Sequence, residues 1–417
     1  MRKLLILVLI TSPAWCKSQN QRYDLHSDTL TYQYFLKGDW NTLIDSAQYA
    51  LKRNIDFKFL RQRLGYAYYI KGEFYKSEYQ YERALKFDPQ DETTNNYLYY
   101  CGINTGNETY TRYRSGRLSM SNKKSFGIKP VNAISLVDCE YNVKYNDHNE
   151  RGNPYYFRLG VGTQLGYHID IYQAFSIYKQ INKSNYVENS GSIPIQTTDS
   201  SSVKQAEYYI SCNWNIAPHW QINMGYHYLN SALQTHSKYV YNIGTKKYST
   251  SLDSTYNLPG HLFHTRISYD WKRLNLGLSG SVFNYYSRIT QQYGAFAGVI
   301  LPGKNYITLQ TALYGMLNDQ KMKKIIYSQS VGALFFKRLW VEGAVKLGNL
   351  DYFSDNNGLY IYNSLDPTTF RSGVSSFLKI NKHISFFGNY TYDRKLIEDN
   401  NISYNQHSFS GGIIWKL

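Results

Sequence analysis

Apolar and polar side chains alternate with period 2 through most of this chain, and the last stretch, residues 401–417, shows the pattern most clearly. One row of that stretch is mainly apolar and consists of Phe409, Gly411, Ile413, Trp415 and Leu417. The opposite row is mostly small or polar and consists of Ser408, Ser410, Gly412, Ile414 and Lys416. This alternation predicts a β-strand with one face toward lipid and the other toward a polar space.

The same pattern repeats from residue 129 onward as strand, tight turn, strand and longer polar connection. Tight turns are predicted near 168–170, 217–219, 271–273, 302–305, 337–338 and 381–383. Longer connections are predicted at 146–154, 181–203, 230–259, 287–289, 318–323, 351–366 and 396–402. The pattern therefore predicts, over residues 129–417, an all-β transmembrane antiparallel β-barrel of about 14 strands with its short turns at one end.

The alternation also assigns side chains to the two faces of the predicted barrel. Rows such as Phe157, Leu159, Val161 and Leu165, or Trp220, Ile222, Met224, Tyr226 and Tyr228, are expected to meet lipid. The predicted lumen-lining residues are Asp138, Glu140, Arg158, His168, Glu207, His227, His264, Arg266, Asp270, Glu342, Lys346, Arg371 and Asp393. Two interpretations of this mixed charge stay open: paired wall residues in a wet interior, or a track that selects ions or sugars by charge.

Between residues 24 and 90 the period changes from that of a strand to that of a helix. The positions that carry a motif are Leu64, Gly65, Tyr68, Gly72, Phe74, Ser77, Tyr81, Ala84, Leu85 and Pro89. One repeat length upstream, about 34 residues, stand Leu30, Tyr34, Gly38, Trp40, Leu43, Ala47, Ala50 and Leu51. Both sets resemble the tetratricopeptide repeat. With a capping helix over 92–103, this predicts a small all-α module over residues 19–103 that leans on the periplasmic rim of the barrel.

The resemblance implies a concave groove on this module. Its predicted partner-binding residues are Asp28, Tyr32, Phe35, Gln62, Tyr66, Tyr69, Asn96 and Tyr100. Such an aromatic lining suits a sugar chain or an extended peptide. The alternative is that these rings only pack the small module against the barrel or the linker.

The segment between the two parts, residues 104–128, has no apolar period and is rich in Gly, Ser and Asn. Its five basic residues are Arg112, Arg114, Arg117, Lys123 and Lys124. The composition predicts a solvated linker. A plug threaded into the barrel is the alternative.

Composition agrees with a barrel rather than a helical membrane protein. The mean hydropathy of −0.51 is low, and past the N-terminus no apolar run reaches the roughly 20 residues that a spanning helix needs. The 44 Tyr and 7 Trp suit aromatic girdles at two membrane interfaces. The net charge of +16 suits acidic lipid head groups, lipopolysaccharide phosphates or an acidic glycan rather than nucleic acid once the chain is exported.

Export is predicted by residues 1–18, where Arg2 and Lys3 precede an apolar run over 4–10, as in a secretory signal peptide. Beyond it, Cys101, Cys139 and Cys212 lie in separate segments without a CxxC pattern, so neither a disulfide framework nor a metal site is expected. Single histidines and serines without a GxSxG, HExxH or phosphate-loop motif give no reason to expect an enzyme or a cofactor.

A repeat module ahead of such a barrel resembles exopolysaccharide exporters and YaiO-type surface barrels of Bacteroidota, and the final strand resembles the closing strand of bacterial outer-membrane barrels. The resemblance implies an outer-membrane channel or export component, with the module in the periplasm and long loops at the cell surface. The module would dock a periplasmic or outer-membrane protein, or hand over polysaccharide or peptide cargo. The alternative is a non-conducting outer-membrane anchor for a protein complex.

Overall fold

The computed structural model describes residues 23–128, 131–148, 150–190, 193–243, 246–285, 288–301, 306–319, 323–364, 366–397 and 402–417. The predicted signal peptide lies outside these residues. The chain divides into two compact units, one ending at Gly106 and one beginning at Asn107. Among the described residues, no helix is long and apolar enough to cross a membrane.

The first unit is helical and contains two helix pairs followed by a single helix. Its helices are α1 (Leu25–Lys37), α2 (Trp40–Lys52), α3 (Lys58–Ile70), α4 (Phe74–Ala84) and α5 (Glu92–Thr105). Asp24, Asp39 and Asp91 cap α1, α2 and α5 by accepting hydrogen bonds from backbone N–H groups three residues on. Gly38 ends α1 with φ of 69°, a conformation that glycine adopts without strain. Helix α5 covers the capping helix predicted over 92–103.

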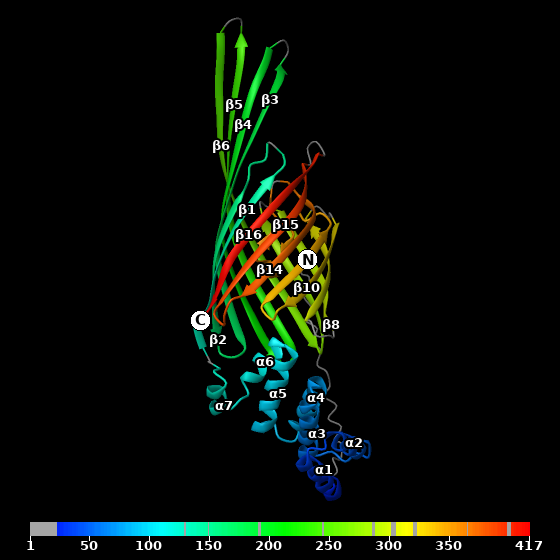
Figure 1. Cartoon of the computed structure of the whole chain (residues 1–417). Helices are drawn as coiled ribbons and strands as arrows, with labels where there is room; N and C mark the ends of the chain where they lie inside the picture. Colours follow the sequence, from blue (N-terminus) through cyan, green and yellow to red (C-terminus); the bar gives the residue numbers. More distant parts are fainter. Residues whose placement is uncertain are drawn as a thin grey trace, which may run out of the picture. The chain divides into compact units, whose positions relative to one another are not determined.

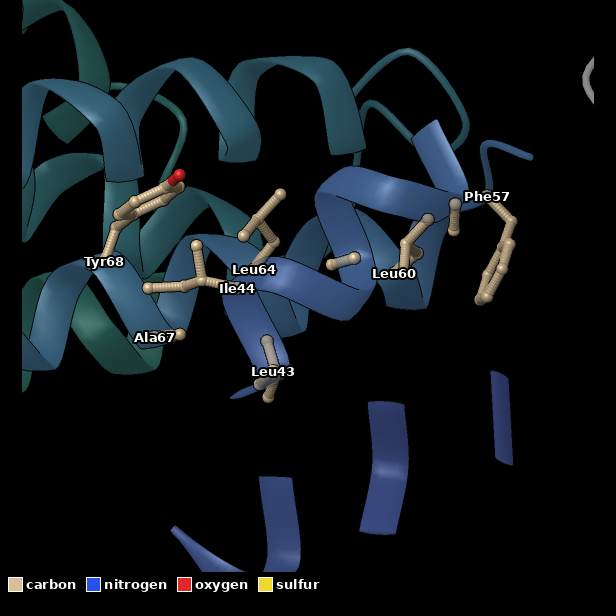
Figure 2. Close-up of a cluster of buried hydrophobic side chains, with 9 residues drawn as sticks. Leu43, Ile44, Phe57, Leu60, Leu64, Ala67 and Tyr68 are labelled. Atoms are coloured by element: carbon tan, nitrogen blue, oxygen red, sulfur yellow. The ribbon is translucent and has the colours of Figure 1, made fainter. Parts of the chain in front are cut away.

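The core of this unit joins α2 to α3. Leu43, Leu60, Leu64 and Ala67 are fully buried there, as Figure 2 shows. At the next interface a Cβ on Gly65 would lie 3.0 Å from the Tyr81 ring. The small motif residues therefore allow the helices to approach closely, and the aromatic residues fill the space between them.

The second unit is a closed antiparallel β-barrel of fourteen strands, as the sequence predicted (Figure 1). The order around the barrel is β1-β16-β15-β14-β11-β10-β9-β8-β7-β6-β5-β4-β3-β2. The strands are β1 (Val131–Asn146), β2 (Tyr155–Leu165), β3 (Ile169–Ser190), β4 (Ile193–Ala217), β5 (Trp220–Ile243), β6 (Lys246–Trp271), β7 (Leu274–Tyr285), β8 (Arg288–Leu301), β9 (Ile307–Asn318), β10 (Lys323–Phe335), β11 (Leu339–Leu347), β14 (Thr368–Lys379), β15 (Ile384–Ile397) and β16 (Ile402–Lys416). The final strand closes the barrel by pairing with β1 on one side and β15 on the other.

The outer face of the barrel is apolar. Phe157 and Leu159 of β2, Met224 of β5, and Phe409 and Trp415 of β16 are each more than a third exposed. These belong to the rows that the alternation directs outward. An apolar outer surface around a closed ladder is the arrangement that a lipid bilayer requires.

The prediction of surface loops is wrong for two of the longer connections. Residues 181–203 and 230–259 are mostly paired strand, because β3 to β6 continue through them as two long hairpins that reach well beyond the other strands (Figure 1). These strands hold 22 to 26 residues, about twice the 9–11 that cross a bilayer. Their Ser, Thr and Tyr residues are polar enough to suggest loops, yet Thr and Tyr also favour strands.

The expected linker is also wrong, because its residues fold into helices. The first of them complete α5, and α6 (Glu108–Ser115) and α7 (Met120–Ser125) follow. Asn107 and Ser119 cap α6 and α7 through their side chains, a local signal that the missing apolar period obscured. Both helices contact tight turns of the barrel, and the barrel interior is occupied by a different segment, described below. The predicted turn at 302–305, and parts of the connections at 318–323 and 396–402, lie outside the described residues.

The seam between β1 and β16 yields a test of the barrel. A Cβ on Gly412 would lie 2.0 Å from the Cys139 carbonyl oxygen, whereas one on Gly411 would meet only the Phe387 carbonyl oxygen at 3.5 Å. Gly412→Val should therefore destabilise the barrel by about 1–3 kcal/mol or more, and Gly411→Val should be tolerated. The measurement is the fraction of folded barrel, read from its heat-dependent migration in SDS gels. Equal loss of folded barrel in both variants would contradict this seam.

Candidate functional site

The inner face of the barrel wall carries a group of ion-paired side chains. Asp138 and Glu140 on β1 lie beside Arg158 on β2, whose Nη2 is 2.9 Å from Glu140 Oε2 and 3.3 Å from Asp138 Oδ1. All three side chains are buried. A guanidinium shared by two carboxylates offsets part of their negative charge despite their burial.

The interior also holds a segment of the chain, residues 348–364 with 366 and 367, which we call the inner segment. It connects β11 to β14 and contains β12 (Ser354–Asp355), the short helix η1 (Asn356–Gly358) and β13 (Tyr360–Ile361), which pairs with β12. Its polar backbone is satisfied in part by this small hairpin, since Tyr352 N–H donates to the Tyr362 carbonyl at 2.8 Å. The prediction that residues 351–366 form an external loop is therefore wrong.

Apolar side chains hold one end of the inner segment. Leu350 and Phe353 have no exposed surface and pack with Met316 of β9 and Ile326 of β10. Leu359 packs in a second cluster with Ala174 and Tyr209 of the wall. Burial of such side chains stabilises this position by about 1.5–3 kcal/mol for each large one.

Backbone carbonyls of η1 are also bound by the wall. The Asn357 carbonyl accepts a hydrogen bond from the Tyr209 hydroxyl at 2.9 Å, and the Gly358 carbonyl lies 2.8 Å from His227 Nδ1. Gly358 has φ of 86°, and a Cβ there would lie 2.8 Å from the Leu262 side chain. Only glycine fits this close approach without strain.

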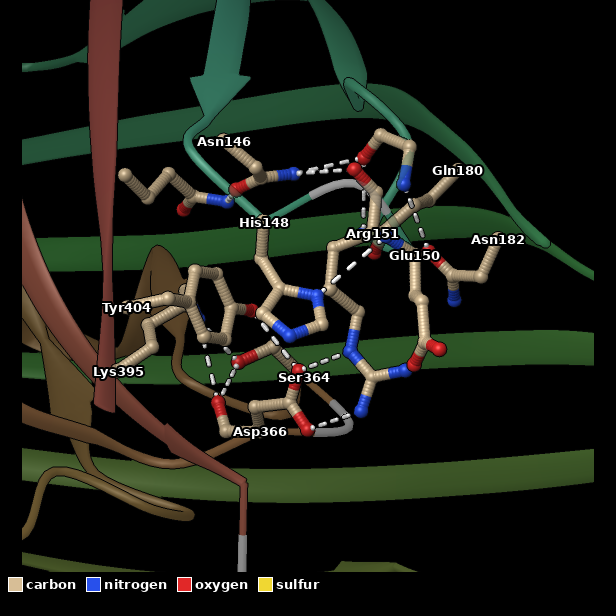
Figure 3. Close-up of polar contacts among 12 residues, drawn as sticks. Asn146, His148, Glu150, Arg151, Gln180, Asn182, Ser364, Asp366, Lys395 and Tyr404 are labelled. Atoms are coloured by element: carbon tan, nitrogen blue, oxygen red, sulfur yellow. Dashed lines mark hydrogen bonds and ion pairs between the residues drawn. The ribbon is translucent and has the colours of Figure 1, made fainter. Parts of the chain in front are cut away.

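Charged side chains fasten the other end, as Figure 3 shows around Asp366. The two Asp366 oxygens lie 2.6 and 3.0 Å from Arg151 Nε and Nη2, and Oδ2 accepts from the Tyr404 hydroxyl at 2.8 Å. Lys395 Nζ donates to Ser364 Oγ at 2.8 Å and to the Asp366 carbonyl. A paired fork of this kind combines strength with a fixed orientation.

Two further ion pairs lie on the same side of the interior. Lys346 of β11 pairs with Asp355 of the inner segment, and Arg371 of β14 pairs with Asp393 at 2.7 Å while donating to Tyr362 of the inner segment. The Tyr360 hydroxyl donates to Glu140 at 2.7 Å, which links the inner segment to the Arg158 group.

A cavity of about 410 Å³ lies between the inner segment and the wall. Its charged lining is nearly balanced and consists of Glu140, Glu207, Glu342, Asp355, Asp366 and Asp393 with Lys144, Arg151, Lys346, Arg371 and Lys395. Tyrosines, serines and side-chain amides make up most of the rest. The volume falls within the range of about 300–1,000 Å³ typical of ligand sites, and the lining suits a polar occupant.

The structure brings together most of the residues predicted to line the lumen. Asp138, Glu140 and Arg158 form the ion-pair group, and Glu342, Lys346, Arg371 and Asp393 line the cavity or its edge. Glu207 Oε2 lies 3.4 Å from His227 Nε2. His264 is buried near η1, since a Cβ on Gly358 would lie 3.2 Å from its Cβ.

Three predicted lumen residues lie elsewhere in the barrel. Arg266 is 3.7 Å from the centre of the Phe296 ring and is not part of the cavity lining. Asp270, near the tight turn after β6, accepts a hydrogen bond from Asn275 at 2.6 Å. His168 lies in the turn between β2 and β3, where a Cβ on Gly116 of the adjoining helical segment would approach it to 2.7 Å.

The turn around His168 is where the short helices contact the barrel. Arg112 of α6 pairs with Asp170 at 2.5 Å, Tyr110 stacks on His219 with ring centres 4.8 Å apart, and Lys123 lies 4.2 Å above the Tyr167 ring. Burial lowers the pKa of His168, and the nearby Arg117, Lys123 and Arg112 lower it further. The imidazole is therefore neutral at pH 7.

The predicted groove residues of the helical unit are mostly engaged with one another. Tyr66 contacts Phe35, Trp40 and Tyr97, and Tyr69 also contacts Tyr97. Further contacts are those of Asp28 with Arg63, Gln62 with Asp91 and Thr94, and Tyr100 with Tyr97. Tyr32 keeps 48% of its surface exposed, and Asn96 lies on α5.

Burial makes the Cys101 thiol poorly reactive. Cys101, Cys139 and Cys212 are free, and burial raises the pKa of the Cys101 thiol to about 12. A thiol with so high a pKa is protonated at neutral pH and is a poor nucleophile or metal ligand.

Sequence reasoning missed the inner segment and its partners Arg151 and Tyr404. One signal was present. Residues 350–362 carry two Leu, one Phe, one Ile and three Tyr, which is an apolar content unusual for a solvated connection.

Comparisons with known proteins concern the fold alone. No family model matches the chain, and no curated protein is similar to it. Among solved structures, a bacterial polysaccharide outer membrane secretin is 8% identical, with 68% of this chain and 99% of that chain covered and a TM-score of 0.38. A mutant of the monoaromatic hydrocarbon channel TodX is 6% identical, with coverage of 69% and 91% and a TM-score of 0.48. The TPR domain of Sgt2 from Aspergillus fumigatus is 15% identical, with coverage of 26% and 80% and a TM-score of 0.24.

The Asp366 contacts predict how firmly the inner segment is held. Asp366→Asn removes the charge that Arg151 pairs with and should weaken the attachment by about 1–3 kcal/mol. Amide hydrogen exchange at Tyr352, Phe353 and Tyr362 should then accelerate by roughly tenfold. Asp253→Asn, which alters an exposed carboxylate bonded to His236 in a long hairpin, is the matched control. Unchanged exchange in a folded Asp366→Asn barrel would show that this pair does not hold the segment.

Proposed function

We propose that the protein is an outer-membrane channel or export component whose lumen is closed by the inner segment. The observation that carries the proposal is the polar cavity of about 410 Å³ beside a segment folded into a closed barrel. Hydrogen-bonding side chains from both the wall and the inner segment line this cavity. Such a lining suits the passage of a polar solute or polymer.

The attachment of the inner segment supports a closure that opens. β11 and β14, the strands on either side of the inner segment in the sequence, pair directly with each other from Leu339↔Leu378 to Leu347↔Phe370. The barrel ladder is therefore continuous without the inner segment. The inner segment is joined to the rest of the wall mainly through side chains. It therefore leaves the lumen without any break in the strand ladder, at the cost of its ion pairs and buried apolar contacts.

The site of action follows from the two ends of the barrel. In outer-membrane barrels the short turns face the periplasm, and α6 and α7 contact the short turns here. On this basis the helical module lies in the periplasm and the long hairpins lie at the cell surface. The predicted signal peptide agrees with export, and the net charge of +16 favours contact with lipopolysaccharide phosphates.

The helical module is proposed to dock a protein partner or to hand over cargo such as a polysaccharide or a peptide. Its aromatic row from Phe35 through Tyr66 to Tyr97 is mutually packed, so it forms a rigid surface. Tyr32 on α1 is 48% exposed, with the Arg63 guanidinium 5.0 Å from the centre of its ring. Exposed tyrosine beside arginine is a combination that recurs in protein recognition.

Single-channel conductance in planar bilayers tests the closure. Replacing residues 350–363 with a Gly/Ser sequence of the same length should convert a mostly closed protein into one that conducts steadily. Removing residues 19–124 instead should leave the inner segment, and hence the closed state, in place. A large steady conductance of the unaltered protein would contradict closure by the inner segment.

A non-conducting membrane anchor is the second candidate, and the density of contacts around the inner segment favours it. Apolar clusters, η1 contacts and ion pairs hold the segment at both ends. Silence of the unaltered protein, of the inner-segment replacement and of the truncated protein would establish the anchor and exclude the channel.

Partner binding at the groove of the helical module can be tested with a substitution that leaves the hydrophobic core of the module intact. Tyr32→Ala should reduce cross-linking of a periplasmic partner in intact cells by about tenfold, as expected for an exposed anchor residue. Tyr49→Ala is the matched control, because Tyr49 is 62% exposed on α2 and also lies under an arginine, Arg53. Equal yields of the cross-linked product in both variants would place the docking surface elsewhere.

A further inference from the structure

The two long hairpins form a four-stranded sheet of their own beyond the rest of the barrel. We call this sheet the extension; it comprises residues 181–190, 193–204, 230–243 and 246–259. Below it, β2 pairs with β3 only as far as Tyr155↔Lys179, and β7 pairs with β6 only as far as Gly260↔Tyr285. The extension therefore has two edges of its own.

The edge along β6 has backbone groups without a strand partner. Residues 246–259 pair with β5 on one side, and on the other side no strand among the described residues pairs with them. In a strand alternate residues direct their N–H and C=O groups to opposite sides, so about half of the backbone groups here face outward. In water these groups are solvated, and they match the backbone of another extended chain.

The opposite edge along β3 is different because a neighbouring loop covers part of it. Lys183 N–H donates to the Glu150 carbonyl at 3.1 Å, and Gly152 N–H donates to the Asn182 side chain at 3.1 Å. A Cβ on Gly152 would lie 1.6 Å from the Ile181 carbonyl oxygen, so the loop lies directly against the strand. The β6 edge is thus the more accessible of the two.

The side chains along the β6 edge are arranged for recognition. Tyr248, Leu252 and Tyr256 lie on one face and are 43%, 60% and 52% exposed. Thr250 and Ser254 alternate with them on the same face, and the odd positions Ser249, Ser251, Asp253 and Thr255 are polar and lie on the other face. Tyr248 stacks on Tyr241 of β5 with ring centres 5.6 Å apart, which holds that ring in place.

This edge lacks most of the features that usually protect an edge strand. Natural edges are blunted by bulges, by prolines or by charged side chains, lysine above all, and the lysines of this edge, Lys246 and Lys247, stand only at its outer end. From Lys246 to Pro259 the pairing with β5 is continuous and without a bulge. Its one acid, Asp253, is bonded to His236 of β5, and Pro259 lies only at the lower end. The strand therefore remains a regular pairing template.

We propose that the β6 edge, residues 246–259, binds an extended segment of a partner protein as an added antiparallel strand. The added strand continues the position that β7 holds below Gly260, so it extends a pairing interface already present in the barrel. Its alternate apolar side chains contact Tyr248, Leu252 and Tyr256, while its backbone satisfies the outward N–H and C=O groups. This interaction is independent of whether the lumen conducts.

The probe for this site is a synthetic peptide of about twelve residues with alternating valine and threonine, added to the full-length protein in detergent micelles. The peptide should slow amide hydrogen exchange within residues 246–259 saturably and leave β8 to β11 unchanged. The same peptide with alternate backbone nitrogens methylated should bind at least tenfold more weakly, because it cannot complete the ladder.

Variants of β6 separate edge pairing from general adhesion. Leu252→Lys with Tyr256→Lys should weaken peptide binding by tenfold or more. Ser251→Lys with Thr255→Lys, on the opposite face of the same strand, is the matched control and should bind as the unaltered protein does. Exchange in β7 and β16 confirms that each variant has a folded barrel.

Three outcomes would overturn the proposal. The first is the absence of saturable protection of residues 246–259 by the peptide. The second is equal weakening by both pairs of lysine substitutions, or equal binding of the methylated peptide. The third is protection of residues 246–259 that rises with protein concentration in the absence of peptide, which would show that a second copy of the chain occupies the edge.

Discussion

Closure of the strand ladder is the constraint on which the barrel depends. A backbone within lipid must satisfy its hydrogen bonds internally, and a sheet does so only when its first and last strands pair. Pairing of β1 with β16 achieves this here. Once the ladder is closed, period 2 directs every second side chain inward, and in this chain the inward residues are mostly polar while the outward ones are apolar.

That polar interior explains the inner segment. Largely enclosed charges such as Arg151 and Arg371 are costly unless they are paired, and the inner segment supplies partners for them in Asp366 and Tyr362. The same contacts hold the segment in the lumen and leave a polar cavity at its side. The same contacts of the inner segment therefore both close the lumen and compensate the charges of the wall.

The barrel itself was predictable from the sequence because period 2 is a local property, and rows such as that of Phe409 and Trp415 display it directly. The lengths of β3 to β6 were not, because Ser- and Thr-rich strands in water resemble loops in composition. The inner segment escaped prediction for another reason. Contacts such as Arg151 with Asp366 join residues more than two hundred positions apart, and no local pattern encodes them.

The inner segment occupies the lumen, and the accessibility of Leu359 tests this placement most directly. Leu359 is 7% exposed and packs against Ala174 and Tyr209, whereas Leu252 in the extension is 60% exposed. With the native cysteines replaced by serine, a cysteine at each position is reacted with a water-soluble maleimide. A cysteine in place of Leu359 should react about a hundredfold more slowly than one in place of Leu252. Equal rates would show that the segment lies outside the lumen and would contradict this account.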